Sequence, residues 1–448
     1  MSADPDAIQT AVPTAEQLRR VAPFSRHVHR RGRRFFKPLR RELLQEPAEG
    51  IAHLDLKIAK CLEMCAAFTD PGFLDRVADR LARRFGNSRV HAPLLRALVF
   101  QRRFEDACGR AIAHADTVPD DPGVRFDAIR YQLIAGKAEA ALGQALVLLS
   151  KLIDDAGPLG TSVAGLLLQA GRAAEVQDIR PDIAALHPGF ARERTLSAPD
   201  GQLPIFCMTL DRDQRRMATT RHFLSGAGQL REVTGVDGSA LPSHVLETAV
   251  TGEGARLSRG EVGCSLSHLS TWERVAEECG DDDYALVLED DSHFLFGPGK
   301  GLGEVLERAR AAKAGLVFVN ERACRTAATQ VGQDPVTLFP VAHDFAPGTP
   351  RAMPRDPGWG GDGYLLSGGE ASRLCDIWSK TGLLGALDWQ LHLMCFAHLE
   401  PWQDHKFCRS IYRSLAAMER WPRNDGYVSN LALTGHSDFG FSSINSLA

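Results

Sequence analysis

The spacing of apolar residues changes near residue 195 of the 448-residue chain, and this change limits what each half can fold into. From about Gly50 to Pro188, apolar residues recur every three or four positions, which is typical of amphipathic helices. After the turn-rich segment 197–202, short apolar runs of strand length alternate with helix-like segments. We therefore expect an all-α domain followed by an α/β domain with a mostly parallel sheet.

A weak repeat runs through the helical half. Arg102–Ala107 is echoed by Gly136–Ala141 and Gly171–Val176, at offsets of 34 and 35 residues. This period resembles the tetratricopeptide repeat, although one copy lacks the glycine and two lack the aromatic residue. The repeat predicts a solenoid of helical hairpins, with a generic helical bundle as the alternative. A repeat surface of this kind binds a protein partner or only supports the next domain.

The N-terminal arm is strongly basic. Residues 1–41 carry ten Lys or Arg against three acids, a local balance of +7, although the formal net charge of the chain is −4. Such an arm can contact an anionic membrane surface, or it can be a solvated terminus. It lacks the apolar core of a signal peptide, and no apolar stretch is long enough to cross a membrane.

The composition changes divide the chain into four expected regions. These are a basic, partly disordered arm (1–45), a helical domain (46–195), an α/β domain (200–420) and a C-terminal tail (421–448). The ten cysteines form no repeated CxxC pairs, and several, such as Cys207 and Cys395, lie inside apolar runs. We interpret them as buried thiols of a cytoplasmic protein. The basic arm is the candidate for peripheral contact with the inner membrane face, and we expect no nucleic-acid partner.

Three adjacent acids, Glu289, Asp290 and Asp291, follow the apolar run Tyr284–Leu288. Ligands of open α/β sheets gather at the C-terminal ends of strands. Adjacent carboxylates repel one another unless a cation or water offsets their charge, and oxygen clusters suit Mg²⁺ or Mn²⁺. A cation there can neutralise the charge on a leaving nucleoside diphosphate. The alternative is a solvated acidic strand end.

Six segments occur in a fixed order along the second half of the chain. Together they resemble glycosyltransferase family 25, which contains bacterial lipooligosaccharide galactosyltransferases and collagen hydroxylysine galactosyltransferases. The resemblance covers about residues 203–400, and its most specific part is the Gly-Glu-x-Gly-Cys-x-x-Ser-His block followed by Leu-Glu-Asp-Asp. The segments are Leu210–Arg216, Val236–Gly238, Ser258–His268, Leu286–Asp291, Gly361–Ser367 and Leu387–Trp389.

The resemblance implies a GT-A-like fold, a UDP-sugar donor, Mn²⁺ or Mg²⁺ as cofactor, and inversion at the anomeric carbon. By motif, Glu289 and Asp291 take the place of the metal ligands. The residues that it implies for donor binding are Asp211, Arg212, Arg216, Asp237, Glu261, His268 and Asp290.

Structural readings compete with several of these assignments. For Arg215 and Arg216, a charged helix face is the open alternative to a contact with the nucleotide or its phosphates. Ser258 and Glu261 fit a capping box. Glu261, Cys264 and His268 share one helix face, on which we expect Cys264 to pack and His268 to brace the site or serve the structure alone.

Asp388 is the candidate general base. Inverting transfer needs a carboxylate that takes the proton of the acceptor hydroxyl, on the side opposite the leaving diphosphate. Asp388 follows an apolar stretch and precedes Trp389, whose face can stack on a sugar. The alternatives are that Asp362 is the base, or that Asp388 only caps a helix.

The family pattern is not complete, so neither the sugar nor the acceptor is inherited from it. The first strand ends Thr209-Leu210 where the family has Asn-Leu, and Asp362 stands at the place of a threonine. We expect transfer of a hexose, in this family usually galactose, to a glycan such as lipopolysaccharide core or capsule, which can be lipid-linked. The alternatives are a protein acceptor held by the helical repeats, and a non-catalytic repeat scaffold with a decayed transferase domain.

Overall fold

The structure, a computed structural model, divides the chain into two compact units between Ala135 and Gly136. Helices α9 to α12 therefore group with the sheet, whereas the change in sequence pattern lies near residue 195. The residues that the structure describes are 26–45, 51, 53–152, 157–186, 189–190, 195–199, 203–242, 244–245, 257–324, 336–342, 360–396, 413 and 426–436.

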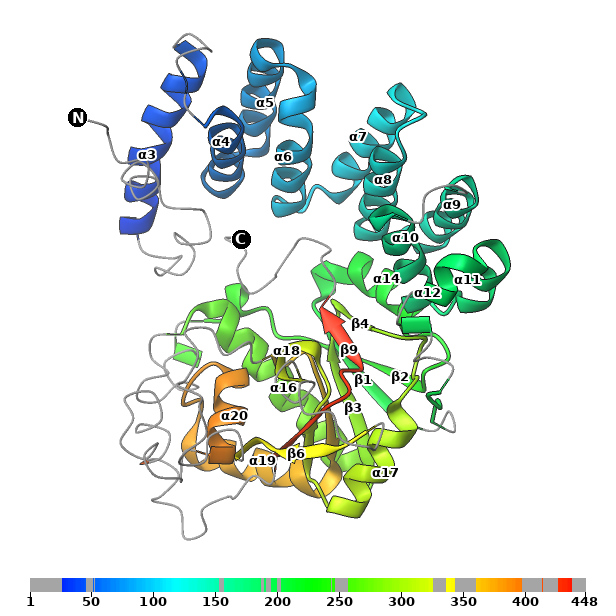
Figure 1. The fold of residues 1–448 in the computed structure, drawn as a ribbon. Coiled ribbons are helices and arrows are strands. Elements are labelled where there is room, and N and C mark those ends of the chain that lie inside the picture. Colours follow the sequence, from blue (N-terminus) through cyan, green and yellow to red (C-terminus); the bar gives the residue numbers. More distant parts are fainter. Residues whose placement is uncertain are drawn as a thin grey trace, which may run out of the picture. The chain divides into compact units, whose positions relative to one another are not determined.

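The first unit is built from helices packed around one apolar core (Figure 1). Asp70 and Asp121 cap two of them by accepting hydrogen bonds from backbone N–H groups of the first turn, and a proline follows each cap. Residues 26–45 of the expected arm form a helix, and residues 1–25 lie outside the described part. The helices are α3 (Arg26–Gln45), α4 (Leu54–Phe68), α5 (Pro71–Phe85), α6 (Asn87–Phe100), α7 (Phe104–Thr117) and α8 (Pro122–Ile134).

The 34- and 35-residue repeat has a structural counterpart in the backbone. Arg102, Gly136 and Gly171, the first residues of the three copies, all adopt positive φ angles of 60°, 78° and 75°. Each lies in a short turn between two helices, so the copies are successive helix–turn–helix steps. The first copy manages the turn without a glycine, because Arg102 itself takes the left-handed conformation. The N-terminal region is helical, as the sequence predicts.

The second unit begins with four helices and continues into a three-layer α/β domain. The helices are α9 (Ala138–Lys151), α10 (Pro158–Gln169), α11 (Ala173–Ile179) and α12 (Pro181–Leu186). At the joint with the sheet domain, a Cβ added to Gly136 would lie 2.9 Å from the carbonyl oxygen of Arg215, and one added to Gly171 would lie 3.0 Å from Pro298. These turns therefore pack closely on the domain that follows.

We expect the same substitution to have opposite effects at two glycines of this region. Gly136→Ala should lower the free energy of unfolding by about 1–3 kcal/mol, because alanine is strained at positive φ and its methyl group meets the Arg215 carbonyl. Gly143→Ala should raise it by about 0.5–1 kcal/mol, since Gly143 is an exposed residue inside α9 with nothing within 4 Å of the added carbon. Urea unfolding of the full chain measures both, and effects of the same sign would contradict the assignment of the turn.

The sheet of the second unit has seven strands in the order β2-β1-β3-β7-β5-β8-β6. Strands β2, β1, β3, β5 and β8 share one direction, while β7 and β6 run opposite to their neighbours. The expected mostly parallel sheet is therefore a mixed one, with antiparallel β7 at its centre. The strands are β1 (Pro204–Thr209), β2 (Gln229–Thr234), β3 (Tyr284–Glu289), β5 (Leu316–Phe318), β6 (Leu338–Pro340), β7 (Gly363–Ser367) and β8 (Gly426–Ser429).

Helices cover both faces of this sheet (Figure 1). Helices α14 (Gln214–Leu224) and α17 (Leu302–Ala312) pack on one face. On the other face lie α16 (Arg259–Glu278), α19 (Gly368–Thr381) and α20 (Leu387–Phe396). The smaller elements are β4 (Ser292–Phe294), β9 (Thr434–His436), α18 (Glu321–Cys324), η2 (Asp211–Asp213) and η3 (Gly238–Ala240).

Two further sequence expectations bear on this unit. The region expected as a tail from residue 421 contains β8, which pairs with β5 and β6, and β9, which pairs with β4. The nine cysteines of the described residues are free thiols, and six of them, including Cys207 and Cys395, are buried, whereas Cys264, Cys279 and Cys375 are partly exposed. None of the helices in the described part combines the length and apolar content that crossing a bilayer requires.

Candidate active site

The alternation of side chains along β3 separates the three adjacent acids. Leu286 and Leu288 point to the face covered by α14 and α17, and Ala285 and Val287 point to the face covered by α16. Continuing this period of two directs Glu289 toward α16 and Asp290 toward α14. The acids therefore have different partners, although they adjoin in sequence.

Asp290 and Asp291 are buried beside one arginine. The Nη2 atom of Arg216 on α14 lies 3.0 Å from Oδ1 of Asp290 and 2.5 Å from Oδ2 of Asp291. The Thr209 hydroxyl donates a hydrogen bond of 2.9 Å to the Asp290 carboxylate, and the Thr220 hydroxyl donates one of 2.6 Å to the Asp290 carbonyl. Arg216 thus holds the acids from inside the protein, and the reading of Arg216 as part of a solvated helix face does not describe it.

Two carboxylates share the single positive charge of Arg216. Burial raises the pKa of the Asp290 carboxyl to about 7. Arg216 lowers this pKa, but the negative charge of Asp291 offsets part of that effect. Burial opposes the charge of Arg216, yet Asp291 and Asp290 raise its pKa above the ordinary value, so it stays charged. Arg216 therefore keeps its positive charge, and the raised pKa of Asp290 lets this carboxyl keep its proton to a higher pH than an exposed aspartate does.

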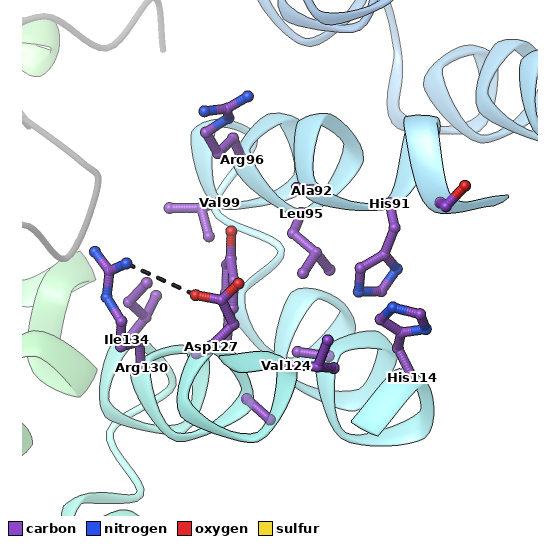
Figure 2. A pocket seen from close by; sticks show the side chains of 14 residues that line it. His91, Ala92, Leu95, Arg96, Val99, His114, Val124, Asp127, Arg130 and Ile134 are labelled. Carbon is purple, nitrogen blue, oxygen red and sulfur yellow. Dashed lines mark ion pairs between the residues drawn. The ribbon is translucent and has the colours of Figure 1, made fainter. Parts of the chain in front are cut away.

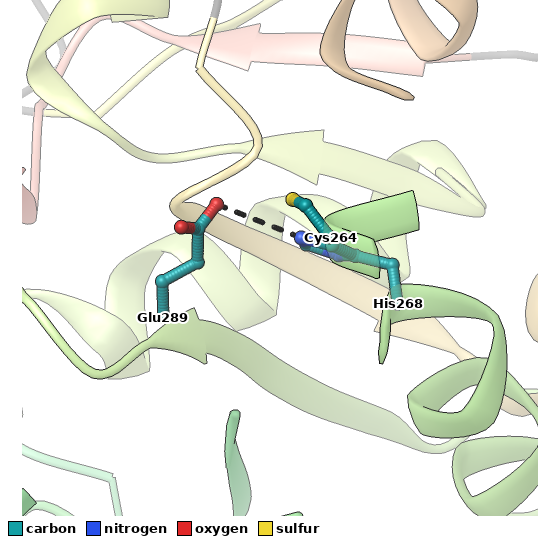
Figure 3. Close-up of side chains that lie close together, drawn as sticks. All are labelled: Cys264, His268 and Glu289. Atoms are coloured by element: carbon teal, nitrogen blue, oxygen red, sulfur yellow. Dashed lines mark ion pairs between the residues drawn. The ribbon is translucent and has the colours of Figure 1, made fainter. Parts of the chain in front are cut away.

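Glu289 lies on the other side of the strand, beside Cys264 and His268 of α16 (Figure 3). Its side chain is 26% exposed, and its Oε1 lies 3.6 Å from Nε2 of His268. The other ring nitrogen of His268, Nδ1, is hydrogen-bonded to the Tyr364 hydroxyl at 2.8 Å. Trp272 Nε1 donates to the same hydroxyl, also at 2.8 Å. Tyr364, itself held by Trp272, therefore fixes the orientation of the His268 ring. Bracing, one of the roles expected for His268, agrees with this geometry.

The glycine-containing segment before β7 brings a fourth carboxylate to the site. Asp362 is buried, and its Oδ1 lies 2.6 Å from Nη2 of Arg322. The buried Asn320 side chain donates hydrogen bonds to the carbonyls of Gly360 and Gly363, which fixes the segment on either side of Asp362. The Asp362 backbone carbonyl accepts a hydrogen bond from Ser292, next to the acids of β3.

Asp388 lies in the first turn of α20, on the same side of the sheet as Glu289. A Cβ added to Gly361 would lie 3.6 Å from His268 Cε1 and 3.9 Å from Asp388 Cβ, so both side chains flank one glycine. Burial raises the pKa of the Asp388 carboxyl to about 6, and the negative charges of Glu289 and Asp362 add to this rise. The hydrogen bond from the Trp389 N–H and the charge of Arg322 lower the same pKa in part. A carboxylate with this pKa is suited to accept a proton near neutral pH.

Two of the residues expected to bind the donor already form a pair. Arg212 Nη1 lies 2.8 Å from Oδ2 of Asp237, and both side chains are partly exposed. Asp237 also caps η3 by accepting from the backbone N–H and hydroxyl of Ser239. Asp211 is exposed at the start of η2, beyond the end of β1. These three side chains follow the ends of β1 and β2, as the sequence predicts. Their position alone does not show which of them contacts a ligand.

Glu261 has the structural role that was its alternative. Its carboxylate accepts from the Ser258 N–H at 2.7 Å, and the Ser258 hydroxyl accepts from the Glu261 N–H at 3.2 Å, which is the predicted capping box. The same motif allows close packing, because a Cβ on Gly263 would lie 2.5 Å from the Gly238 nitrogen. The first turn of α16 therefore sits directly on the Val236–Gly238 turn.

The acids at the end of β3 do not form an all-oxygen cage for Mg²⁺ or Mn²⁺. Arg216 occupies Asp290 and Asp291, and Glu289 faces a thiol and an imidazole. The expected Mn²⁺ or Mg²⁺ ligand set of Glu289 and Asp291 stays a prediction, and it requires Asp291 to turn away from Arg216.

Sequence reasoning missed Tyr364, Trp272, Asn320 and Arg322. Tyr364, Asn320 and Arg322 contact His268 or the segment around Asp362 from distant parts of the sequence. Trp272 lies one turn after His268 on α16 and donates to the Tyr364 hydroxyl. Tyr364 belongs to a recognised motif, so a buried hydroxyl in need of a partner was the available signal. The other three follow from the tertiary structure alone.

A separate pocket of about 450 Å³ lies in the first unit, among α6, α7 and α8. The rings of His91 and His114 lie 4.2 Å apart at one end, and Asp127 and Arg130 form a 3.8 Å ion pair toward the other (Figure 2). Burial lowers the pKa of His91 to about 4, and His114 adds to this, so His91 is neutral at physiological pH. The pocket offers both apolar and charged surface on the helical unit.

The strand ends of the second unit carry charged side chains. Carboxylates and arginines lie at the C-terminal ends of β1 and β3, which is the edge where open α/β sheets bind their ligands. Residues 202–331 match the family model of glycosyltransferase family 25 (LPS biosynthesis protein). The resemblance read from the motifs is thereby confirmed over β1 to α18, which is under a third of the chain.

The matched family consists of glycosyltransferases and is described by lipopolysaccharide biosynthesis. The match ends before the segments that carry Asp362 and Asp388, and it does not reach the helical unit. No curated protein matches the chain.

Proposed function

We propose that this protein transfers a hexose from a UDP-sugar to a glycan acceptor such as lipopolysaccharide core or capsule, with inversion at the anomeric carbon. The observation that carries the proposal is the family match, which spans the strand end bearing Glu289. Glu289 and Asp362 both raise the pKa of Asp388, and all three carboxylates raise the pKa of Arg322, although Asp362 and Asp388 lie outside the match. Glu289, Asp362 and Asp388 thus come from three different segments of the α/β unit and act on one another's charge.

In the proposed reaction, Asp388 takes the proton from the acceptor hydroxyl as its oxygen forms the new bond to the anomeric carbon. The bond from that carbon to the diphosphate oxygen breaks on the opposite face, and the electron pair leaves with UDP. Arg322 lowers the cost of carrying negative charge at Asp362 and Asp388 before the proton arrives. A GT-A-like fold remains part of the proposal, and the mixed sheet with central β7 is compatible with it.

The proposed cofactor is Mn²⁺ or Mg²⁺. When bound, a divalent cation neutralises charge on a leaving diphosphate. This part of the proposal rests on the chemistry of the leaving group and not on the arrangement of the acids.

Donor use is tested by measuring UDP release from a panel of UDP-sugars. We expect release from at least one hexose donor, a loss of release in EDTA, and recovery with Mn²⁺ or Mg²⁺. Asp376→Asn changes an exposed carboxylate of α19 that is paired with Lys380 and lies outside the site. This variant should release UDP as the wild type does. Release that persists fully in EDTA would remove the cation from the proposal, and no release from any UDP-sugar would remove the proposal itself.

A protein acceptor is the second candidate. The pocket among α6, α7 and α8 favours it, since it gives the helical unit a mixed apolar and charged surface for a partner. A transferase specific for such an acceptor would lose protein modification, but not donor hydrolysis, when the pocket is changed by Arg96→Glu. We also propose that the basic N-terminal arm makes a peripheral contact with an anionic membrane surface.

A further inference from the structure

Three side chains with metal-binding atoms converge at the end of β3. The Cys264 thiol, the His268 imidazole and the Glu289 carboxylate each offer one atom, and these atoms all lie within 4.8 Å of one another (Figure 3). Cys264 and His268 are four residues apart on α16, so they project from the same helix face, and Glu289 meets them from the strand. No other such group of three occurs in the described part of the chain.

His268 is held in the orientation of a metal ligand. Only 1% of the residue is exposed, and Nε2 finds no hydrogen-bond partner among the described residues. Its other nitrogen is engaged by Tyr364, whose ring lies nearly parallel to the imidazole, and Trp272 fixes the tyrosine in turn. A partner on the second nitrogen that fixes the ring is what accompanies most metal-binding histidines. A buried nitrogen aimed at a thiol and a carboxylate is costly to leave unused.

The donor set indicates the kind of cation. Sulfur and imidazole nitrogen favour borderline ions such as Zn²⁺ and Co²⁺ over Mg²⁺. Bonds of about 2.0–2.3 Å in a tetrahedral site place ligand atoms about 3.5 Å apart. Nε2 and Oε1 already lie 3.6 Å apart, and the thiol lies within 4.8 Å of both. Three protein ligands leave the fourth position open.

We propose that Cys264, His268 and Glu289 form a binding site for a single Zn²⁺-like cation, which shares Glu289 with the all-carboxylate site implied by the acidic motif but takes its other two ligands from α16. The ordinary alternative is a packed cysteine beside a histidine–glutamate contact, and it leaves Nε2 without a hydrogen bond. Burial, Glu289 and Asp388 raise the pKa of the Cys264 thiol well above its ordinary value, so the cation has to displace the thiol proton.

Cobalt spectroscopy of the full-length protein tests the site without reference to sugar transfer. The metal-free protein is titrated with Co²⁺, and we expect one equivalent to produce a near-ultraviolet thiolate charge-transfer band that Zn²⁺ abolishes. Cys264→Ser should remove the band, while Cys279→Ser, at the other end of α16, should keep it. Glu289→Gln and Tyr364→Phe should weaken Co²⁺ binding at least tenfold.

The outcomes separate this site from adventitious binding to other thiols. No band in the wild type, or a band that survives Cys264→Ser, overturns the proposal. Circular dichroism shows whether Cys264→Ser is folded, and Glu289→Gln gives an independent reading that leaves every thiol in place. UDP release is not part of this readout, so failure of the metal site and failure of the transferase proposal remain distinguishable.

Discussion

Asp388→Asn is expected to lower sugar transfer by about a hundredfold or more while the protein remains folded. Asparagine keeps the shape of the side chain and can still accept the Trp389 N–H, but it cannot take a proton from the acceptor hydroxyl. If Asp388 only capped the helix, losing the cap would cost about 1 kcal/mol of stability, and Asn would still provide the cap. Turnover and unfolding measured on the same samples therefore separate the catalytic role from the structural one.

The pH profile gives a second reading of the same residue. Because the base acts in its ionised form and burial raises its pKa to about 6, turnover of the wild type should rise as pH increases through about 6. The raised pKa also means that ionised Asp388 destabilises the folded state, by an amount that grows as pH rises from about 4 to about 6. Asp388→Asn should therefore be at least as stable as wild type at pH 7.

Asp362 is the next residue to consider if this expectation fails. Turnover of Asp388→Asn within a few-fold of wild type, with the acid limb unchanged, would place the base elsewhere. Asp362 is held by Arg322, so Asp362→Asn then becomes the informative variant.

Arg216→Met is expected to lower the free energy of unfolding by about 3–5 kcal/mol. The substitution keeps most of the side-chain volume but leaves Asp290 and Asp291 buried without their shared cation. Arg221→Met, on the same helix, is the matched control. Arg221 makes a two-pronged pair with Glu232 at 2.5 and 2.7 Å, but the pair is exposed and should be worth at most about 1 kcal/mol.

Removing the acids together with the arginine should recover stability. In Arg216→Met combined with Asp290→Asn and Asp291→Asn, the two acids beside the arginine are also neutral, so part of the loss should be regained, while buried Asp213 keeps its charge. Urea unfolding of the four proteins gives the comparison. A cost for Arg216→Met as small as that of Arg221→Met would show that the acids are not held by this arginine.

Most elements around the site could be predicted from the sequence, because local spacing determines them. The apolar runs ending at Leu210 and Leu288 became β1 and β3, and the segment from Ser258 to Cys279 became α16 with its predicted capping box. The motif order identified the family over the segment that the comparison matches. These features depend on residues close together in the chain.

The partners within the site could not be predicted, because they depend on tertiary packing. The three acids were interpreted as one cluster, whereas the period of two along β3 sends Glu289 to α16 and Asp290 to Arg216. The alternation was visible in the sequence, but which helix covers each face was not. The direction of β7 was likewise hidden, because an apolar run carries no record of its neighbours. The first copy of the repeat also lacks the glycine expected in its turn, because Arg102 adopts the left-handed conformation there. Sequence preferences alone do not predict this conformation for an arginine.

The central claim, that the α/β unit is a sugar-nucleotide glycosyltransferase, is tested most directly by following one labelled hexose from donor to acceptor. The full-length protein is incubated with the UDP-hexose that it hydrolyses best and with lipopolysaccharide-core oligosaccharide, and both products are quantified by mass spectrometry. We expect UDP and hexosylated acceptor to form in equal amounts, with a product whose anomeric configuration is opposite to that of the donor. An acceptor that remains unmodified with every UDP-hexose, while the protein is folded, would contradict the account.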